Sequence, residues 1–137
     1  MQLTTYLNFN GNCEAAFKFY AETVGGKITL MMTQGESPMG DKVPEAMKGK
    51  IMHATLEAPG GSVLMGADHP QGKNVRPTGF CVSIQLTETA EAREIFNGLS
   101  DGGTVQMEFQ KTFWSPGFGM CTDKFDIPWM INCATAA

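Results

Sequence analysis

The strongest constraint on the fold is an internal repeat. The stretch EAAFKFYAETVGGKITLMM begins at Glu14, and EAREIFNGLSDGGTVQMEF begins at Glu91. Both open with Glu-Ala, pass through an aromatic residue and reach a Gly-Gly pair followed by an alternating segment, at a constant offset of 77 residues. A repeat of this length indicates a duplicated structural unit. We therefore expect two copies of one small fold.

Each copy shows the order strand, helix and three strands, because short alternating segments flank one segment of helical periodicity. Glycine pairs end both helices, since glycine accepts the left-handed conformation of a helix stop. Residues 34–50 are rich in Gly, Ser and Pro and are predicted as a long loop. The predicted strands span residues 4–9, 28–33, 51–57 and 62–66 in the first copy, and 81–86, 104–109, 118–122 and 127–133 in the second.

The periodicity also predicts which side chains are buried. Leu7, Phe9, Ile84 and Leu86 form the apolar faces of the first strands, and Asn12 and either Thr87 or Thr89 are candidate helix caps. In the third strand, Met52, Ala54 and Leu56 share one face and His53, Thr55 and Glu57 the other. The expected buried helical stripes are Ala15, Ala16, Phe19 and Tyr20 in the first copy, and Ala92, Ile95, Phe96 and Leu99 in the second.

A four-stranded sheet with one helix leaves its second face uncovered, so two copies in one chain are expected to pair about a pseudo-twofold axis. We predict an α+β fold in which paired βαβββ modules form a curled eight-stranded mixed sheet around a cleft, with the helices outside. A length of 137 residues, with 42% apolar and 18% charged residues, suits one domain over residues 1–137. The modules span about residues 1–70 and 78–137.

Composition excludes several partners. The net charge of -4 and the lack of a Lys/Arg cluster argue against nucleic acid, and no apolar run approaches a membrane span. The sequence starts with no signal-like segment, so we predict a cytoplasmic protein. Its four cysteines, Cys13, Cys81, Cys121 and Cys133, form no C-x-x-C pair and are expected to be reduced thiols.

Three stretches resemble a known family: YLNFNGNCEAAFKFY from Tyr6, MHATLEAPGGSVLMGAD from Met52 and GGTVQMEFQKTFWSPGFGMCTDKFDIPWMIN from Gly102. They resemble the PhnB-like branch of the vicinal oxygen chelate superfamily of glyoxalases, bleomycin-resistance proteins and ring-cleaving dioxygenases. The resemblance implies paired βαβββ modules and a homodimer. Asp126 is a departure, because the branch usually has glycine there. Some relatives carry a ubiquinone-related methyltransferase label, but this sequence has no glycine-rich nucleoside-binding loop after its first strand.

The resemblance also implies metal-ligand positions on the first and last strands of each module. These positions fall on Thr4 and Cys81, and on or beside Met65 and Met130. None is the imidazole or carboxylate that Zn, Ni, Mn or Fe requires, so we expect no metal and no cofactor. Two alternatives stay open: soft Cu(I) on the Met, Met and Cys trio, and a metal held by His53, His69 and Glu108.

Single residues also have competing interpretations. His53 suits acid/base chemistry at the cleft or a hydrogen-bonded strand edge, and Cys81 is either a nucleophile or an inert thiol. Trp114, beside Phe113, would cover a ligand, close the core or meet a second subunit. Trp129 is expected to pack beneath a helix. Structural roles in turns are favoured for Asp68, Asp123 and Asp126, and His69 is expected in a solvated loop.

We therefore predict a protein that binds an unknown small organic molecule without the superfamily's metal. The alternatives are a metal-dependent lyase, isomerase or dioxygenase-type enzyme, and a drug-sequestering resistance protein. Whether a reaction is catalysed stays open. The predicted cleft residues are Thr4, Tyr6, Asn8, His53, Thr55, Met65, Cys81, Ser83, Gln85, Trp114 and Met130.

Overall fold

A computed structural model describes residues 1–69 and 76–134 of the chain. The chain forms two compact units, Met1–Asn74 and Val75–Ala137. Within the described residues, no helix combines the length and apolar character needed to cross a membrane.

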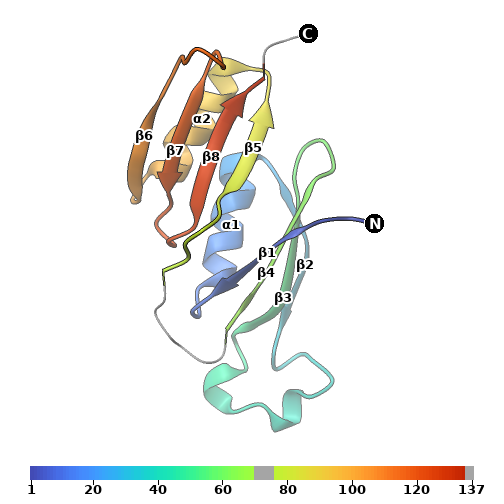
Figure 1. Ribbon diagram of the computed structural model, residues 1–137. Coiled ribbons are helices and arrows are strands. Elements are labelled where there is room, and N and C mark those ends of the chain that lie inside the picture. Colours follow the sequence, from blue (N-terminus) through green and yellow to red (C-terminus); the bar gives the residue numbers. More distant parts are fainter. Residues whose placement is uncertain (70–75, 135–137) are drawn as a thin grey trace. The chain divides into compact units, whose positions relative to one another are not determined.

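The described part of unit 1 is a four-stranded sheet with one α-helix (Figure 1). Its strands lie in the order β1-β4-β3-β2, with β1 parallel to β4 and the other neighbours antiparallel. The predicted loop 34–50 contains two short 3-10 helices, Gly40–Lys42 and Glu45–Met47, which the prediction missed. The main elements are β1 (Thr5–Phe9), α1 (Cys13–Val24), β2 (Lys27–Thr33), β3 (Ile51–Glu57) and β4 (Val63–Asp68).

Unit 2 repeats this topology. Its strand order is β5-β8-β7-β6, and β5 is again parallel to β8. The repeat thus predicted the βαβββ order and the α+β class correctly, with strand ends displaced by one or two residues. The structure contains two four-stranded sheets. The elements are β5 (Val82–Leu86), α2 (Thr89–Ser100), β6 (Thr104–Gln110), β7 (Phe118–Thr122) and β8 (Pro128–Cys133).

Helix α1 packs on its sheet through a different stripe from the predicted one. Ala15 is exposed and Phe19 is half-buried, whereas Phe17 is fully buried and its ring centroid lies 6.1 Å from that of Phe9. The buried set follows the i, i+3, i+4, i+7 pattern of a helix face. It consists of Cys13, Ala16, Phe17 and Tyr20.

Close approach of this helix depends on Gly66 in β4. A Cβ atom there would lie 2.8 Å from Cε1 of Phe17 and 2.9 Å from the backbone oxygen of Leu7. Both distances are shorter than van der Waals contact. A residue without a side chain is therefore required beneath the Phe17 ring.

The helix ends confirm the predictions only in part. Gly25 closes α1 with φ of 79°, as expected of a glycine stop. Asn12 occupies the cap position, but its side chain makes no capping hydrogen bond. Helix α2 begins at Thr89 with Glu88 at the cap position, so neither Thr87 nor Thr89 is the cap.

The core of unit 2 follows the prediction closely. Ala92, Ile95, Phe96 and Leu99 of α2 are all buried. Trp129 of β8 is also buried and its Nε1 donates to Asp123 Oδ2 at 2.8 Å, which agrees with its expected packing.

One strand prediction in unit 1 is wrong. Met52 was placed on the buried face of β3, but its side chain is 42% exposed and Ile51 is buried instead. The pairing of β2 with β3 shifts register between Met32 and Thr33, opposite this point. Such a bulge reverses the strict alternation of faces.

Candidate functional site

Each sheet has one face that its own helix does not cover. In unit 1, strand β4 alternates between buried Leu64, Gly66 and Asp68 and the half-buried residues between them. Helix α1 packs against the buried set (Figure 1). We call the opposite face of each sheet its open face. The open face of unit 1 includes Tyr6, Asn8, His53, Thr55 and Met65, and that of unit 2 includes Ser83, Gln85, Met120, Met130 and Asn132.

The open face of unit 1 is organised around His53. Its Nδ1 lies 3.1 Å from the Tyr6 hydroxyl and its Nε2 lies 3.1 Å from Oγ1 of Thr55. The Tyr6 and His53 rings stack with centroids 5.7 Å apart. Both nitrogens of the imidazole are therefore already engaged by uncharged side chains.

Strand pairing explains why these groups meet. Met65 in the inner strand β4 is the register partner of Tyr6 in β1 and of Thr55 in β3.

Burial raises the pKa of Tyr6, and interaction with Cys13 adds to this effect. The phenol consequently stays neutral at physiological pH and acts through its hydroxyl as a donor or acceptor.

Two predicted residues lie just outside the strands. Thr4 directly precedes β1 and Cys81 directly precedes β5, and both are half-buried. Asn8 is exposed and pairs with Ala67 across β1 and β4. The structure thus joins Tyr6, His53 and Thr55 by hydrogen bonds and pairs Met65 with Tyr6 and Thr55 across the strands. Asn8 is the next residue of β1 on the same face.

In unit 2, a row of sulfur-containing side chains crosses the sheet. Met130 pairs with Ser83 on one side and with Met120 on the other, and Met120 pairs with Met107. The Ser83 hydroxyl donates to the Met130 sulfur at 3.8 Å. Thioethers are flexible and polarisable, so this row forms an adaptable apolar floor.

The adjacent row of unit 2 carries amides. Asn132 donates through Nδ2 to Oε1 of Gln85 at 2.8 Å, and Gln85 donates through Nε2 to the Ser83 hydroxyl at 2.7 Å. The other amide atom, Oδ1 of Asn132, is buried and has no hydrogen-bond partner among the described residues. Sequence reasoning missed Asn132 and Met120. Asn132 lies two residues after Met130, so strand alternation alone could have identified it.

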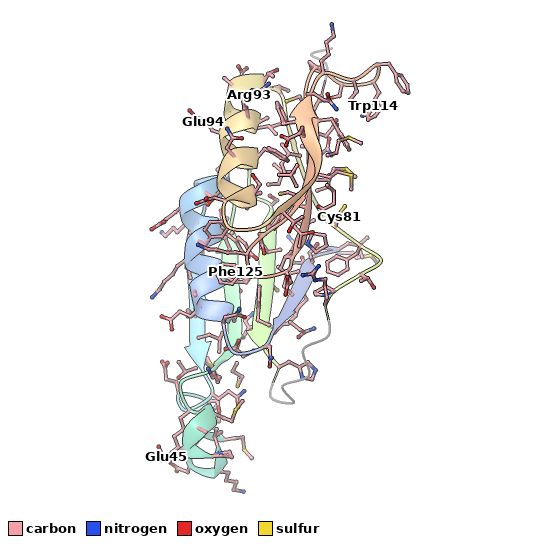
Figure 2. The ribbon with its side chains drawn as sticks, turned by 90° about the vertical axis from the view of Figure 1, so that its left-hand side faces the viewer. Glu45, Cys81, Arg93, Glu94, Trp114 and Phe125 are labelled. Atoms are coloured by element: carbon pink, nitrogen blue, oxygen red, sulfur yellow. The ribbon has the colours of Figure 1, made fainter. Side chains whose placement is uncertain are left out.

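Trp114 lies in the loop between β6 and β7. Figure 2 shows Trp114 and Cys81 on the side of the unit 2 sheet that faces away from α2, which carries Arg93 and Glu94. The Trp114 ring meets Phe118 edge-on at 5.3 Å and Phe113 at 4.7 Å. Phe113 is 97% exposed and Trp114 is 48% exposed, so these aromatics do not close a core.

The turn aspartates have the structural roles expected of them. Asp68 is buried and accepts backbone N–H groups from Gly11, Cys13 and Ile51. Asp123 similarly accepts from the backbone of Phe125 and Ile127 and from the Trp129 indole. Both carboxylates therefore hold chain turns in place.

The thiols divide by environment. Cys13, Cys121 and Cys133 are buried and Cys81 is half-buried. Burial raises the pKa of Cys13 and of Cys121 to about 12, and Asp68 and Asp123 respectively add to the effect. Thiolate chemistry is thus disfavoured at these two sites.

The described residues contain no group of three His, Cys, Asp or Glu side chains arranged to hold a metal ion. His53 and His69 belong to unit 1 and Glu108 to unit 2. The backbone N–H of His69 donates to the Phe9 oxygen. The alternative metal set of His53, His69 and Glu108 thus draws on both units and stays a prediction.

Comparison with known proteins gives consistent matches over the whole chain. The family model described as 3-demethylubiquinone-9 3-methyltransferase matches residues 1–132. Protein YjdN of Escherichia coli K12 is 34% identical, and the match covers 96% of this chain and 95% of YjdN.

Solved structures agree with these sequence matches. Protein PA1353 from Pseudomonas aeruginosa is 41% identical with a TM-score of 0.88, covering 99% of both chains. The PhnB protein from Bacillus cereus has a TM-score of 0.81 at 24% identity, covering 98% of this chain and 100% of its own. A glyoxylase/bleomycin resistance protein/dioxygenase domain from Frankia sp. EAN1pec shares the fold, with a TM-score of 0.65 at 12% identity and coverage of 97% and 94%. The chain belongs to the PhnB-like family that this family model describes, and it shares its fold with the glyoxylase/bleomycin resistance protein/dioxygenase domain.

Proposed function

We propose that this protein binds a small organic molecule on the open faces of its two units and lacks the metal site of its superfamily. The units form one glyoxalase-like domain in this proposal. Full-length similarity to superfamily structures supports the single domain.

The observation that carries the proposal is the chemistry of the open faces. Tyr6, His53 and Thr55 are linked by hydrogen bonds in unit 1, and Ser83, Gln85 and Asn132 are linked in unit 2. This set contains no carboxylate, lysine or arginine, and it lies beside methionine side chains. Apolar surface with a few placed polar groups is typical of sites for small organic ligands.

The residues present fit a hard divalent metal poorly. The superfamily's ligand positions hold Thr4, Cys81, Met65 and Met130, which offer a hydroxyl, a thiol and two thioethers. Zn, Ni, Mn and Fe sites use imidazole and carboxylate ligands. The nearest imidazole on the open face of unit 1, His53, would have to give up a hydrogen bond to Tyr6 or Thr55 in order to ligate.

Metal stoichiometry tests this part of the proposal. The protein is equilibrated with Zn, Ni, Mn or Fe(II), dialysed and analysed for bound ions, and we expect far less than one ion per chain. One tightly held ion per chain refutes the metal-free reading. Turnover of a methylglyoxal–glutathione adduct that depends on added Ni or Zn would support the metal-dependent enzyme instead.

Ligand screening tests the binding part. A thermal-shift screen of neutral and charged organic compounds, including antibiotics, should give hits, because a ligand that binds only the folded state raises Tm. His53→Ala should weaken binding of the compounds found, whereas His69→Ala serves as the matched control outside the strands.

A homodimer and a cytoplasmic location stay predictions. Analytical ultracentrifugation checks the homodimer.

A further inference from the structure

The amide row of unit 2 contains a buried amide oxygen without a hydrogen-bond partner among the described residues. Asn132 uses its NH2 group to bond Gln85, which in turn bonds Ser83. This leaves Oδ1 of Asn132 buried and unpartnered within the described residues. Buried polar atoms in folded proteins are nearly always satisfied, and an orphan commonly indicates a missing partner. The missing partner of a carbonyl oxygen is an N–H or O–H donor.

The two hydrogen bonds of this row are compatible with two directions of the amides. Reversing both amides together would keep the two bonds but leave the NH2 group of Asn132 as the orphan, since Gln85 lies on only one side of it. An acceptor would then be the missing partner. The two directions predict opposite ligand preferences, so ligand chemistry can distinguish them.

The surroundings of the orphan atom are aromatic. Phe118 is paired with Asn132 across β7 and β8, and the Trp114 ring meets Phe118 edge-on at 5.3 Å. Trp114 is about half exposed and offers accessible ring surface in a loop, whereas Phe118 is buried. A flat ring packs favourably against such aromatic edges and faces.

Among the described residues, the strand partners of Asn132 on this face carry no charge to balance an ionic ligand. The register partners around Asn132 on this face are Gln85, Phe118 and, one row away, Ser83, Met130 and Met120. Carboxylates and phosphates bind where Arg, Lys or several backbone N–H groups converge. The strand positions of this patch provide none of these side chains.

We propose that this patch, formed by Asn132, Phe118 and Trp114, binds the planar, uncharged part of the ligand and accepts a hydrogen bond from its N–H or O–H group through Oδ1 of Asn132. The proposal rests on the proposed function and names the ligand class. Because Oδ1 is covered in the structure, the ligand displaces a neighbouring side chain on entry.

Four small aromatic probes test this on the ¹⁵N-labelled full chain: indole, 1-methylindole, quinoline and indole-3-carboxylate. Their binding is followed by NMR titration of the backbone, Trp Nε1–H and side-chain amide signals. We expect indole to bind roughly tenfold more tightly than 1-methylindole, because only indole satisfies the orphan oxygen. Quinoline, which only accepts, and the anionic carboxylate should also bind more weakly than indole.

Variants assign the preference to the patch. Asn132→Leu should remove the difference between indole and 1-methylindole, whereas Asn97→Leu, at an exposed position of α2, should keep it. Trp114→Ala should weaken both indoles about equally, by roughly tenfold, through lost ring contact. The comparison of the four probes on the unaltered chain does not depend on any variant folding.

Several results would overturn the proposal. Equal binding of indole and 1-methylindole removes the donor requirement, and tighter binding of quinoline shows the reversed amide direction. Preference for indole-3-carboxylate contradicts a neutral ligand. If all four probes fail while the thermal-shift screen yields other ligands, the ligand class is wrong but the proposed function stands. If that screen also fails, the proposed function itself is wrong.

Discussion

Asp68 offers the sharpest quantitative test of how unit 1 is held together. Its Oδ1 accepts the backbone N–H groups of Gly11 at 3.0 Å and Cys13 at 2.9 Å, and its Oδ2 accepts that of Ile51 at 2.8 Å. One carboxylate at the end of β4 therefore joins the turn before α1 to the start of β3. Asp68→Asn keeps the shape of this side chain and removes its charge.

The expected cost follows from these three bonds. An asparagine oxygen in the Oδ1 position keeps two of them, but each loses the extra strength of a charged acceptor, roughly 1 kcal/mol. The NH2 group then faces the N–H of Ile51, which loses its partner at a cost of about 1–3 kcal/mol. Relief from burying a carboxylate offsets part of the loss. We expect Asp68→Asn to lower the free energy of unfolding by about 3 kcal/mol, a large part of an ordinary domain's stability.

Urea unfolding followed by far-UV circular dichroism measures this loss. Asp41→Asn is the matched control, because Asp41 is exposed in the first 3-10 helix and should change stability by less than about 0.5 kcal/mol. Amide hydrogen exchange adds a local readout, since the Ile51 N–H should lose protection. A loss below about 1 kcal/mol for Asp68→Asn, or one equal to the control, would refute the argument that these bonds hold the unit together.

Three further predictions concern stability. Asp126 has φ of 68°, so Asp126→Gly should stabilise unit 2 by about 0.5–1 kcal/mol in urea unfolding despite losing an exposed ion pair; a destabilised variant would contradict this. The pKa values of Cys13 and Cys121 rise from 9.0 to about 12, so stability should be complete below pH 9 and fall as the pH rises towards 12; the variant with alanine at both positions should show a flatter decline between about pH 9 and 12. Gly66→Ala forces a Cβ to 2.8 Å from Phe17 and should lower Tm by several degrees, and an unchanged Tm would show that the helix moves freely.

Much of the fold could be predicted because its information is local. The 77-residue repeat implied two copies of one topology, and Gly25 showed where α1 ends. The buried stripe of α2 was correct because its apolar residues are isolated among polar ones. The α1 stripe was correct for Ala16 and Tyr20 and wrong for Ala15 and Phe19, because Phe17, Phe19 and Tyr20 offer two competing apolar faces.

The candidate site was only partly predictable. Strand alternation placed Tyr6, His53 and Thr55 opposite the apolar faces of their strands, and the structure shows that they are neighbours joined by hydrogen bonds. It failed at Met52, where a bulge between β2 and β3 reverses the faces. A bulge depends on how two strands pair, and a single strand's sequence does not reveal it.

The sequence by itself determined the duplicated topology, the glycine stop of α1 and most buried faces, since these follow from periodicity and backbone freedom within short segments. Only the tertiary structure decided that Asp68 joins three separate backbone segments, and that Asn132 meets Gln85 and is left with a buried, unpartnered oxygen. Strands β5 and β8 are parallel and joined through the rest of the unit, so their register is set by helix packing on the far face rather than by a short turn. Hydrogen bonds across such a pair depend on that register and on side-chain rotamers, which no local pattern encodes.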